Sequence, residues 1–490
     1  MSSPPALQAR LGRRAEWGLA AAAVIAAVGL WALTRTYPNY DSYYHLVWGR
    51  ELMDGLAPSF QAYAAPTQHP LWVAVAALLG LIGEDADRAL VLLCLLAHAA
   101  LVLGTYRLGS AVFGRWPGLV AAGFVAASAS FALYALRGYV DTPFLALVVW
   151  AGAVEAERSR APGGQRGAAT GAWRPALLLV LAGLLRPEAW VLAVAYAMWR
   201  WRRADRRSRI GLAAAALAAP LLWATVDLVS TGDLLHSLHA TSELAGELGR
   251  ERGLAAVPGA FVSFLAATVR PPVAVLALAG LYLGVRLLGW RRIVIPLALL
   301  GAGVATFVGT GVIGLSILPR YLTVPAVALC LFAGFALAGF TTLGREDPLR
   351  RTWQRGAAAA VVLALAGLAL LRPSLGPVSA ELAFLQGTHD DLVAVLDDPR
   401  VRSALECGPL TFPNYRLVPD ARWHLDARRE QVGARSARRR ERGVAIFVLG
   451  SKPLRRLGFA DGASPATNAP DPGFAPLARH GRFAAYSACS

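Results

Sequence analysis

The stretch RLGRRAEWGLAAAAVIAAVGLWALTRTYPNYDSYYHL, from Arg10 to Leu46, joins a basic flank, an apolar run and a polar, aromatic cluster. The apolar run, from about Trp17 to Leu33, approaches the roughly 20 residues that a helix needs to cross a bilayer. The arginines before it predict a cytoplasmic start, because cytoplasmic flanks carry an excess of basic residues. The polar cluster therefore begins where the chain leaves the membrane on the outer side.

Composition excludes an ordinary soluble protein. Of the 490 residues, 56% are hydrophobic and 16% are charged, whereas soluble domains carry roughly a quarter charged residues. In lipid every backbone polar group needs an internal partner, so the long apolar runs predict helices. The net charge of +17 lies mostly in short arginine clusters between these runs. That distribution is typical of topology determinants rather than of a nucleic-acid site.

The pattern predicts an all-α polytopic membrane protein with about eleven transmembrane helices. They are expected near 17–33, 89–108, 118–136, from 142, as two short spans on either side of 186–188, and near 212–229, 272–288, 294–313, 321–340 and 356–371. The run LWVAVAALLGLIG is short for a span and predicts a half-buried helix at the outer surface. The outer loops are then 36–88 and 230–270, the second with an amphipathic surface helix over ELAGELGRERG.

Two domains follow from this threading. Residues 1–372 form the transmembrane module, and residues 373–490 are long enough for a small extracytoplasmic α/β domain. Helical spacing covers 389–405, and strand-like runs are GPLTFPN (408–414), VAIFVLG (444–450) and RFAAYSAC (482–489). The N-terminus is expected in the cytoplasm and the tail outside, because long domains translocate despite basic residues.

Four cysteines divide into two pairs. Cys94 and Cys330 lie within spans, where packing is the simplest role. Cys407 and Cys489 lie in the outer domain, where an oxidising compartment permits a disulfide. The sequence leaves open whether they pair. No zinc-type cysteine spacing is present.

Ionisable residues recur at the predicted outer face. They are Asp41, His45, Asp54, His69, Arg137, Asp141, Arg186, Glu188 and Arg320. Any one of them can be an interfacial anchor, with the neighbouring tyrosines and tryptophans forming an aromatic belt. Their recurrence on one face favours a site.

Asp41 has two possible roles on the residues alone. It follows a span exit and lies among aromatics, and a carboxylate there can take a proton from a hydroxyl nucleophile. It also directly precedes SYYHLVWGRELM, which reads as a helix, and Asp is a favoured N-cap. Both roles stay open at this point.

The order of several motifs resembles the GT-C membrane glycosyltransferases, especially the protein mannosyltransferase and aminoarabinose transferase branch. The motifs are YDSYYHLVWGRELMDGLAP, TQHPLW, RLGSAVFGRWPG, RGYVDTPF and LPRYLTVP, and they span roughly the first 340 residues. LRPEAW also resembles a segment of actinobacterial arabinofuranosyl and mannosyl transferases. The tail matches no domain of these families.

The resemblance implies roles for individual residues. Asp41 would be the general base, and Asp141 a second catalytic acid of the outer face. Arg320 would face the lipid phosphate of the donor, because a guanidinium binds phosphate oxygens in a bidentate way. The remaining substrate-binding candidates are Tyr44, His45, His69, Arg137, Arg186, Glu188 and Tyr321.

The implied reaction moves a sugar from a polyprenyl-phosphate donor to a hydroxyl of a glycan, glycolipid or protein, in a bacterial plasma membrane. No glycine-rich phosphate loop appears that would bind a nucleotide sugar. Many relatives carry two adjacent acids where this chain has Asp41-Ser42, and the missing second acid argues against a required metal. A divalent metal stays possible, and no cofactor is assigned. The loop 230–270 can be either a lid or a plain cover.

Two other classes compete with a transferase. A transporter or lipid flippase would need ionisable residues at the membrane midplane, and Asp227 is the nearest candidate. A membrane scaffold would use the tail to bind a partner. A scaffold would tolerate Asp41→Asn, whereas an enzyme using Asp41 as base would not.

Overall fold

The computed structural model describes residues 5–160, 172–371, 376–458 and 466–489. By its internal contacts the chain divides into two compact units. The helical unit comprises Met1–Leu33, His69–Leu71 and Leu92–Pro373. The α/β unit comprises Thr34–Gln68, Trp72–Val91 and Ser374–Ser490. The tail therefore folds with most of the predicted first outer loop.

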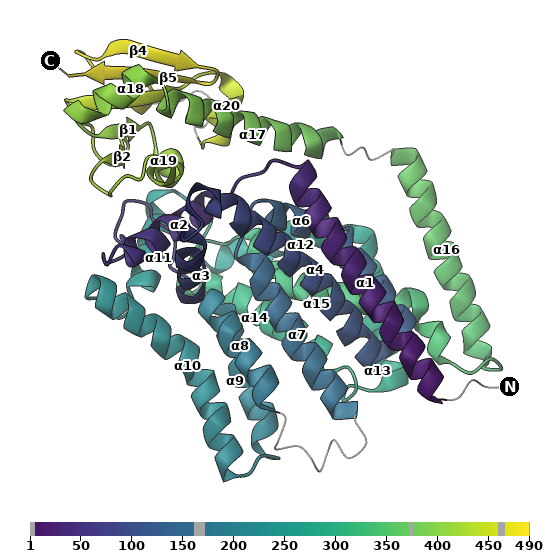
Figure 1. Cartoon of the computed structure of the whole chain (residues 1–490). Coiled ribbons are helices and arrows are strands. Elements are labelled where there is room, and N and C mark those ends of the chain that lie inside the picture. The colour runs from purple at the N-terminus through teal and green to yellow at the C-terminus, as the bar shows by residue number, and fades with distance from the viewer. Residues whose placement is uncertain (1–4, 161–171, 372–375, 459–465, 490) are drawn as a thin grey trace. The chain divides into compact units, whose positions relative to one another are not determined.

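Helices make up the described part of the helical unit (Figure 1). They are α1 (Pro5–Leu33), α4 (Ala86–Phe113, whose first turns belong to the other unit), α5 (Arg115–Ala126), α6 (Ala129–Leu136), α7 (Asp141–Arg160), α8 (Trp173–Leu185), α9 (Glu188–Trp201), α10 (Arg206–Thr231), α11 (His236–Glu247), α12 (Val257–Val269), α13 (Pro271–Leu288), α14 (Val294–Ile313), α15 (Thr323–Ala338) and α16 (Pro348–Leu371). Short 3₁₀ turns η2 (Leu254–Ala256), η3 (Pro319–Leu322) and η4 (Gly339–Thr342) join them.

The predicted count of about eleven spans is not confirmed. Within the described residues, six helices are long and apolar enough to cross a membrane, or seven if the bent pair α5–α6 counts as one span. This pair bends by 57°. Helices α8 and α9 are 13 and 14 residues long, short of the roughly 20 that a bilayer core requires. The structure thus confirms a polytopic helical protein and does not confirm the count of eleven.

Helix α15 forms the centre of the helical unit. It packs against α5, α13 and α14, and nearly all its residues are buried. A helix that is apolar on every side is expected in such a position. Close approach depends on small residues. A Cβ at Gly280 of α13 would lie 1.9 Å from the carbonyl oxygen of Phe332, so glycine is required there.

The predicted second outer loop contains helices α11 and α12. The predicted surface helix over 243–253 overlaps α11 only over 243–247, because α11 begins at His236 and ends at Glu247, and the apolar α12 was not predicted. Asp227, near the end of α10, accepts hydrogen bonds from the backbone N–H and hydroxyl of Ser237 at 2.9 and 2.8 Å. Its carboxylate therefore satisfies the first turn of α11.

The α/β unit contains a five-stranded mixed sheet in the order β2-β1-β3-β5-β4 (Figure 1). Its elements are α2 (Tyr40–Met53), α3 (Pro70–Gly80, whose first residues belong to the helical unit), η1 (Gly83–Asp85), α17 (Gly376–Leu396), α18 (Pro399–Ala404), η5 (Leu405–Cys407), β1 (Leu410–Phe412), η6 (Tyr415–Leu417), α19 (Val418–His424), β2 (Val432–Ala434), β3 (Gly443–Val448), α20 (Ser451–Arg456), η7 (Ala466–Asn468), β4 (Ala475–His480) and β5 (Phe483–Ala488).

The sheet contains the strands predicted from the sequence. β1 runs parallel to both β2 and β3, and β5 runs antiparallel to β3 and β4. All six residues of β3 are buried, as expected for a central strand that is covered on both faces. A disulfide joins Cys407 to Cys489, with 5.5 Å between their Cα atoms. It ties η5 to the end of β5.

Helix α2 is packed into the α/β unit on two sides. A Cβ at Gly49 would lie 2.5 Å from the backbone nitrogen of Ala77, so only glycine lets α2 approach α3 this closely. On another side, α2 packs against α19. Arg50 donates hydrogen bonds to the backbone carbonyls of Arg422 and Trp423 at 2.9 and 3.1 Å. These contacts hold the polar, aromatic segment in a defined place.

Candidate active site

Three predicted site residues form a buried ion cluster in the helical unit. Asp141 is fully buried, and Arg186 and Glu188 are 4% and 9% exposed. The Arg186 guanidinium donates hydrogen bonds to both carboxylates, including Nε to Glu188 Oε1 at 2.9 Å. A buried arginine between two buried acids is stable because each charge has a partner.

Helix ends place these three side chains. Asp141 lies in the first turn of α7, and Glu188 lies in the first turn of α9. Carboxylates are stabilised there by the positive end of the helix dipole. Arg186 is the C-cap of α8 with an extended backbone, and Pro187 then starts α9. The break between two short helices thus turns a guanidinium and a carboxylate toward the start of α7.

Arg320 and Tyr321 lie beside this cluster. Both belong to η3, which Pro319 begins. The Arg186 guanidinium lies 5.3 Å from the centre of the Tyr321 ring, within the range of a cation–π contact. Glu188, Arg320 and Tyr321 line a common cavity of about 10 Å³, enough for about one water molecule. The structure therefore brings Asp141, Arg186, Glu188, Arg320 and Tyr321 together.

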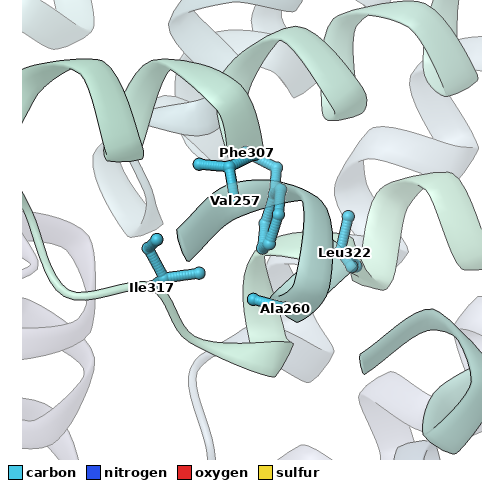
Figure 2. Close-up of a cluster of buried hydrophobic side chains, with 5 residues drawn as sticks. All are labelled: Val257, Ala260, Phe307, Ile317 and Leu322. Atoms are coloured by element: carbon cyan, nitrogen blue, oxygen red, sulfur yellow. The ribbon is translucent and has the colours of Figure 1, made fainter. Parts of the chain in front are cut away.

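An apolar cluster holds η3 in place. Figure 2 shows Val257 and Ala260 of α12, Phe307 of α14, Ile317 and Leu322 packed together. Tyr321 packs against this cluster. The unpredicted helix α12 therefore supports the segment that carries Arg320.

Asp41 lies in the first turn of α2 and is half-buried. The N-cap of this helix is Asn39, whose side-chain oxygen accepts hydrogen bonds from the backbone N–H groups of Asp41 and Ser42 at 2.8 and 3.3 Å. The capping role that the sequence allowed for Asp41 thus belongs to Asn39.

Aromatic side chains surround the rest of α2. Tyr44 is fully buried, and its ring contacts those of Tyr40 and Trp48. His45 is also fully buried, and its Nδ1 lies within hydrogen-bond distance of the Asp41 backbone carbonyl. Tyr43 donates a hydrogen bond to Asp87 at 3.1 Å. Burial raises the pKa of the Tyr43 hydroxyl, and the nearby Asp420 and Asp87 carboxylates raise it further, so it stays protonated.

Two further predicted site residues, His69 and Arg137, lie next to helix ends. His69 is buried at the start of α3, and its ring meets the edge of Trp223 with 5.7 Å between centres. Arg137 is the C-cap of α6, four residues before Asp141. In the described residues, no group of three or more His, Cys, Asp and Glu side chains is arranged to hold a metal ion.

Long-range polar contacts of the α/β unit were not predicted. Arg422 of α19 is 1% exposed. It donates hydrogen bonds to Glu51 at 2.6 Å and to Ser59 at 3.1 Å. His389 of α17 pairs with Asp420 at 2.9 Å and stacks on Tyr37. Partners more than 300 residues apart, such as Arg422 and Glu51, leave no local pattern, so no sequence signal could have identified that pairing.

No protein-family model matches the chain, and no curated protein sequence matches it. Solved structures do. ArnT from Cupriavidus metallidurans, bound to undecaprenyl phosphate, superposes with a TM-score of 0.55 and 13% identity over 96% of this chain and 98% of that one. AglB, an oligosaccharyltransferase from Archaeoglobus fulgidus in complex with an inhibitory peptide and a dolichol-phosphate, superposes with a TM-score of 0.51 and 13% identity over 86% and 64%.

Both of these proteins have the GT-C fold. At such low identity a structural likeness establishes the fold and not the reaction. The resemblance found in the sequence motifs is therefore confirmed at the level of the fold, over nearly the whole chain in the case of ArnT.

Proposed function

We propose that the chain is an integral membrane glycosyltransferase. It transfers a sugar from a polyprenyl-phosphate donor to a hydroxyl acceptor at the outer membrane face. The observation that carries the proposal is the likeness, over 96% of the chain, to a membrane protein that binds undecaprenyl phosphate. A polar, arginine-containing cluster at the ends of short helices is a second observation that supports the proposal.

Arg320 is the proposed contact for the donor phosphate. It lines the cavity that Glu188 and Tyr321 also line, and a guanidinium matches phosphate oxygens in charge and geometry. Arg186 is fixed by Asp141 and Glu188. Its proposed role is to hold the cluster together and to add positive charge near Arg320.

Asp41 is the proposed general base. The acceptor hydroxyl attacks the anomeric carbon, its proton passes to the Asp41 carboxylate, and the bond from that carbon to the phosphate oxygen breaks. The leaving group is polyprenyl phosphate. A single displacement of this kind inverts the anomeric configuration. A product with the donor's configuration would exclude it.

The first experiment compares wild type with Asp41→Asn in lipid nanodiscs. Each protein receives a panel of polyprenyl-phosphate sugars, and mass spectrometry measures donor hydrolysis and transfer. Loss of a general base lowers turnover by about 10²- to 10⁴-fold, while donor binding persists. Asp54→Asn is the matched control, because Asp54 is the exposed C-cap of the same helix.

Each outcome has a distinct meaning. Turnover that falls in Asp41→Asn and persists in Asp54→Asn supports both the reaction and the base. Full activity in Asp41→Asn removes Asp41 from the mechanism. Absence of turnover by wild type over the whole panel argues against a transferase. Donor binding by wild type and by Arg320→Ala then shows whether the donor phosphate binds at Arg320.

We further propose that the N-terminus is cytoplasmic and the tail extracytoplasmic. The Cys407–Cys489 disulfide supports this orientation, because such bonds persist in oxidising compartments. A membrane-impermeant maleimide added to intact cells should label Ser436→Cys, an exposed tail position, and should not label Arg206→Cys at the start of α10. The opposite labelling would overturn the proposed orientation.

No observation in the described residues favours a transporter. Asp227, the nearest candidate for a midplane charge, instead caps α11 through Ser237. Its burial has a structural explanation.

A further inference from the structure

A cavity of about 280 Å³ lies wholly within the α/β unit. Its walls come from β1, β2 and α19 of the tail, from the segment that follows β2, and from Tyr44 and Tyr63 of the N-terminal part of the unit. The volume is close to the lower end of the range for small-molecule sites. It suits one or two sugar rings.

Positive charge dominates the lining. Among the described residues four arginines line the cavity, against a single acid, Glu430. Arg422 is neutralised by Glu51, and Arg429 donates to the backbone carbonyl of Gln61. Arg438 and Arg440 have no ion-pair partner among the described residues. Their charge is thus available to a ligand.

Two neighbouring arginines provide a comparison. Arg439, between Arg438 and Arg440, is paired with Asp471 at 2.9 Å. Arg435, three residues before Arg438, is paired with the same carboxylate at 2.8 Å. Neither of them lines the cavity. Of these four arginines, Arg435 and Arg439 do not line the cavity and are paired with Asp471, whereas Arg438 and Arg440 line it and have no described acid partner.

We propose that this cavity binds an anionic saccharide, through a carboxylate or phosphate group held by Arg438 and Arg440. Two tyrosines, Tyr44 and Tyr63, also line the cavity. Tyr44 is buried, while the Tyr63 ring is 39% exposed, and aromatic rings present flat apolar faces with a polar edge. Such a combination suits a sugar ring that carries a negative charge.

The cavity is also close to the proposed base along α2. Tyr44 follows Asp41 by three residues, which is about 4.5 Å along a helix axis and nearly one turn. The proposed site therefore assigns the acceptor of the transferase to a negatively charged saccharide. That assignment rests on the proposed function, whereas the binding of the saccharide does not.

The test is a binding titration of the full-length protein in nanodiscs made of neutral lipid. The probes are α-1,4-linked tetragalacturonate, the neutral maltotetraose and inorganic phosphate, and microscale thermophoresis reports binding. Wild type should bind tetragalacturonate and not maltotetraose. The double variant Arg438→Gln/Arg440→Gln should bind it at least about tenfold more weakly, because charge-assisted hydrogen bonds are lost.

Two controls isolate the cavity. Arg439→Gln removes the same charge from the same segment outside the cavity, and it should leave the Kd within about twofold of wild type. Arg438→Lys/Arg440→Lys keeps both charges and should retain most of the binding. Displacement of tetragalacturonate by phosphate indicates a site for either anion, and resistance to displacement indicates a carboxylate site. Both results support the proposal.

Three results would overturn it. They are equal weakening by Arg439→Gln, unchanged binding in the Gln double variant, and maltotetraose binding as tight as that of tetragalacturonate. Asp41→Asn should still bind tetragalacturonate, which separates this inference from the reaction. Donor turnover without saccharide binding would defeat the inference alone, and saccharide binding without any donor turnover would defeat the proposed function alone.

Discussion

Two arginine sites, one in each unit, differ in how the arginine charge is compensated. In the helical unit, Arg186 is buried and enclosed by two carboxylates, so its charge is compensated within the chain. In the α/β unit, Arg438 and Arg440 line a cavity and are paired with no described acid. A compensated arginine fixes the geometry around it, whereas an uncompensated one is suited to attract a ligand.

Among the variants that test this comparison, Arg186→Met should cause the largest loss of stability. It leaves Asp141 and Glu188 buried without their shared partner, which destabilises a protein by about 3–5 kcal/mol. We expect a large fall in Tm, measured by thermal unfolding in nanodiscs.

Additional variants distinguish lost charge from lost packing. The triple variant Arg186→Met/Asp141→Asn/Glu188→Gln removes all three charges and should recover much of the lost stability. Arg107→Met is a control, because its pair with Glu157 is about one-third exposed and contributes about 0–1 kcal/mol. A triple variant no more stable than Arg186→Met would contradict the charge explanation.

Removal of the disulfide should have the next largest effect and should be confined to the α/β unit. Cys407 and Cys489 are separated by 82 residues, and loss of a cross-link over such a loop typically costs about 2–4 kcal/mol. Cys407→Ser/Cys489→Ser should therefore lower the unfolding temperature of this unit. Cys94→Ser/Cys330→Ser is the corresponding change in the buried free cysteines. If reductant leaves the Tm of wild type unchanged, the disulfide does not stabilise the unit.

A smaller change in stability should depend on pH, through His389. Burial alone would lower the pKa of His389, but the Asp420 carboxylate outweighs it, with Asp87 and Asp390 adding to the effect, so the pKa is raised. The stabilisation is then complete below the unfolded pKa, near 6.5, and is lost as pH rises through the folded pKa. Between pH 5.5 and pH 9 the free energy of unfolding should fall by less than about 2 kcal/mol, and Tm should fall with it. This fall should be absent in His389→Gln. An equal slope in the variant would assign the pH dependence elsewhere.

The smallest effect on stability should come from the cavity arginines. Arg438→Gln/Arg440→Gln removes two charges that no described acid compensates, so the free energy of unfolding should change by less than about 0.5 kcal/mol. Chemical denaturation provides the measurement. A loss comparable to that of Arg186→Met would mean that these arginines serve the fold, and the contrast between the two arginine sites would disappear.

Apolar patterning predicted the bounds of two helices closely. The span predicted near 294–313 is helix α14, Val294–Ile313, and the one near 272–288 is α13 within a residue. Helix α12 was not predicted, because its 13 residues lie inside a segment that was interpreted as a loop, either a lid or a plain cover. Strands β2 and β4 were also not predicted, since the first has three residues and the second has no buried residue.

The sequence could predict which residues belong to the candidate site but not which of them are in contact. Sidedness placed Asp141 and Arg186 on one face, yet the ion pair joins residues 45 positions apart and depends on how α7 and α8 pack. The N-cap of α2 did have a local signal. Asn39 is as good a cap as Asp41, and it stands two positions earlier.

The contacts between Arg422 and Glu51, and between Arg50 and Trp423, affect when α2 can complete its packing during synthesis. They join residues 371 and 373 positions apart. Ribosomes add about 5–20 residues per second, so α2 is complete roughly 20–75 s before α19 exists. During that interval the surface of α2 that later meets α19 has no partner from its own chain. Pulse-labelled chains should therefore remain open to protease at residues 50–63 until synthesis reaches the tail.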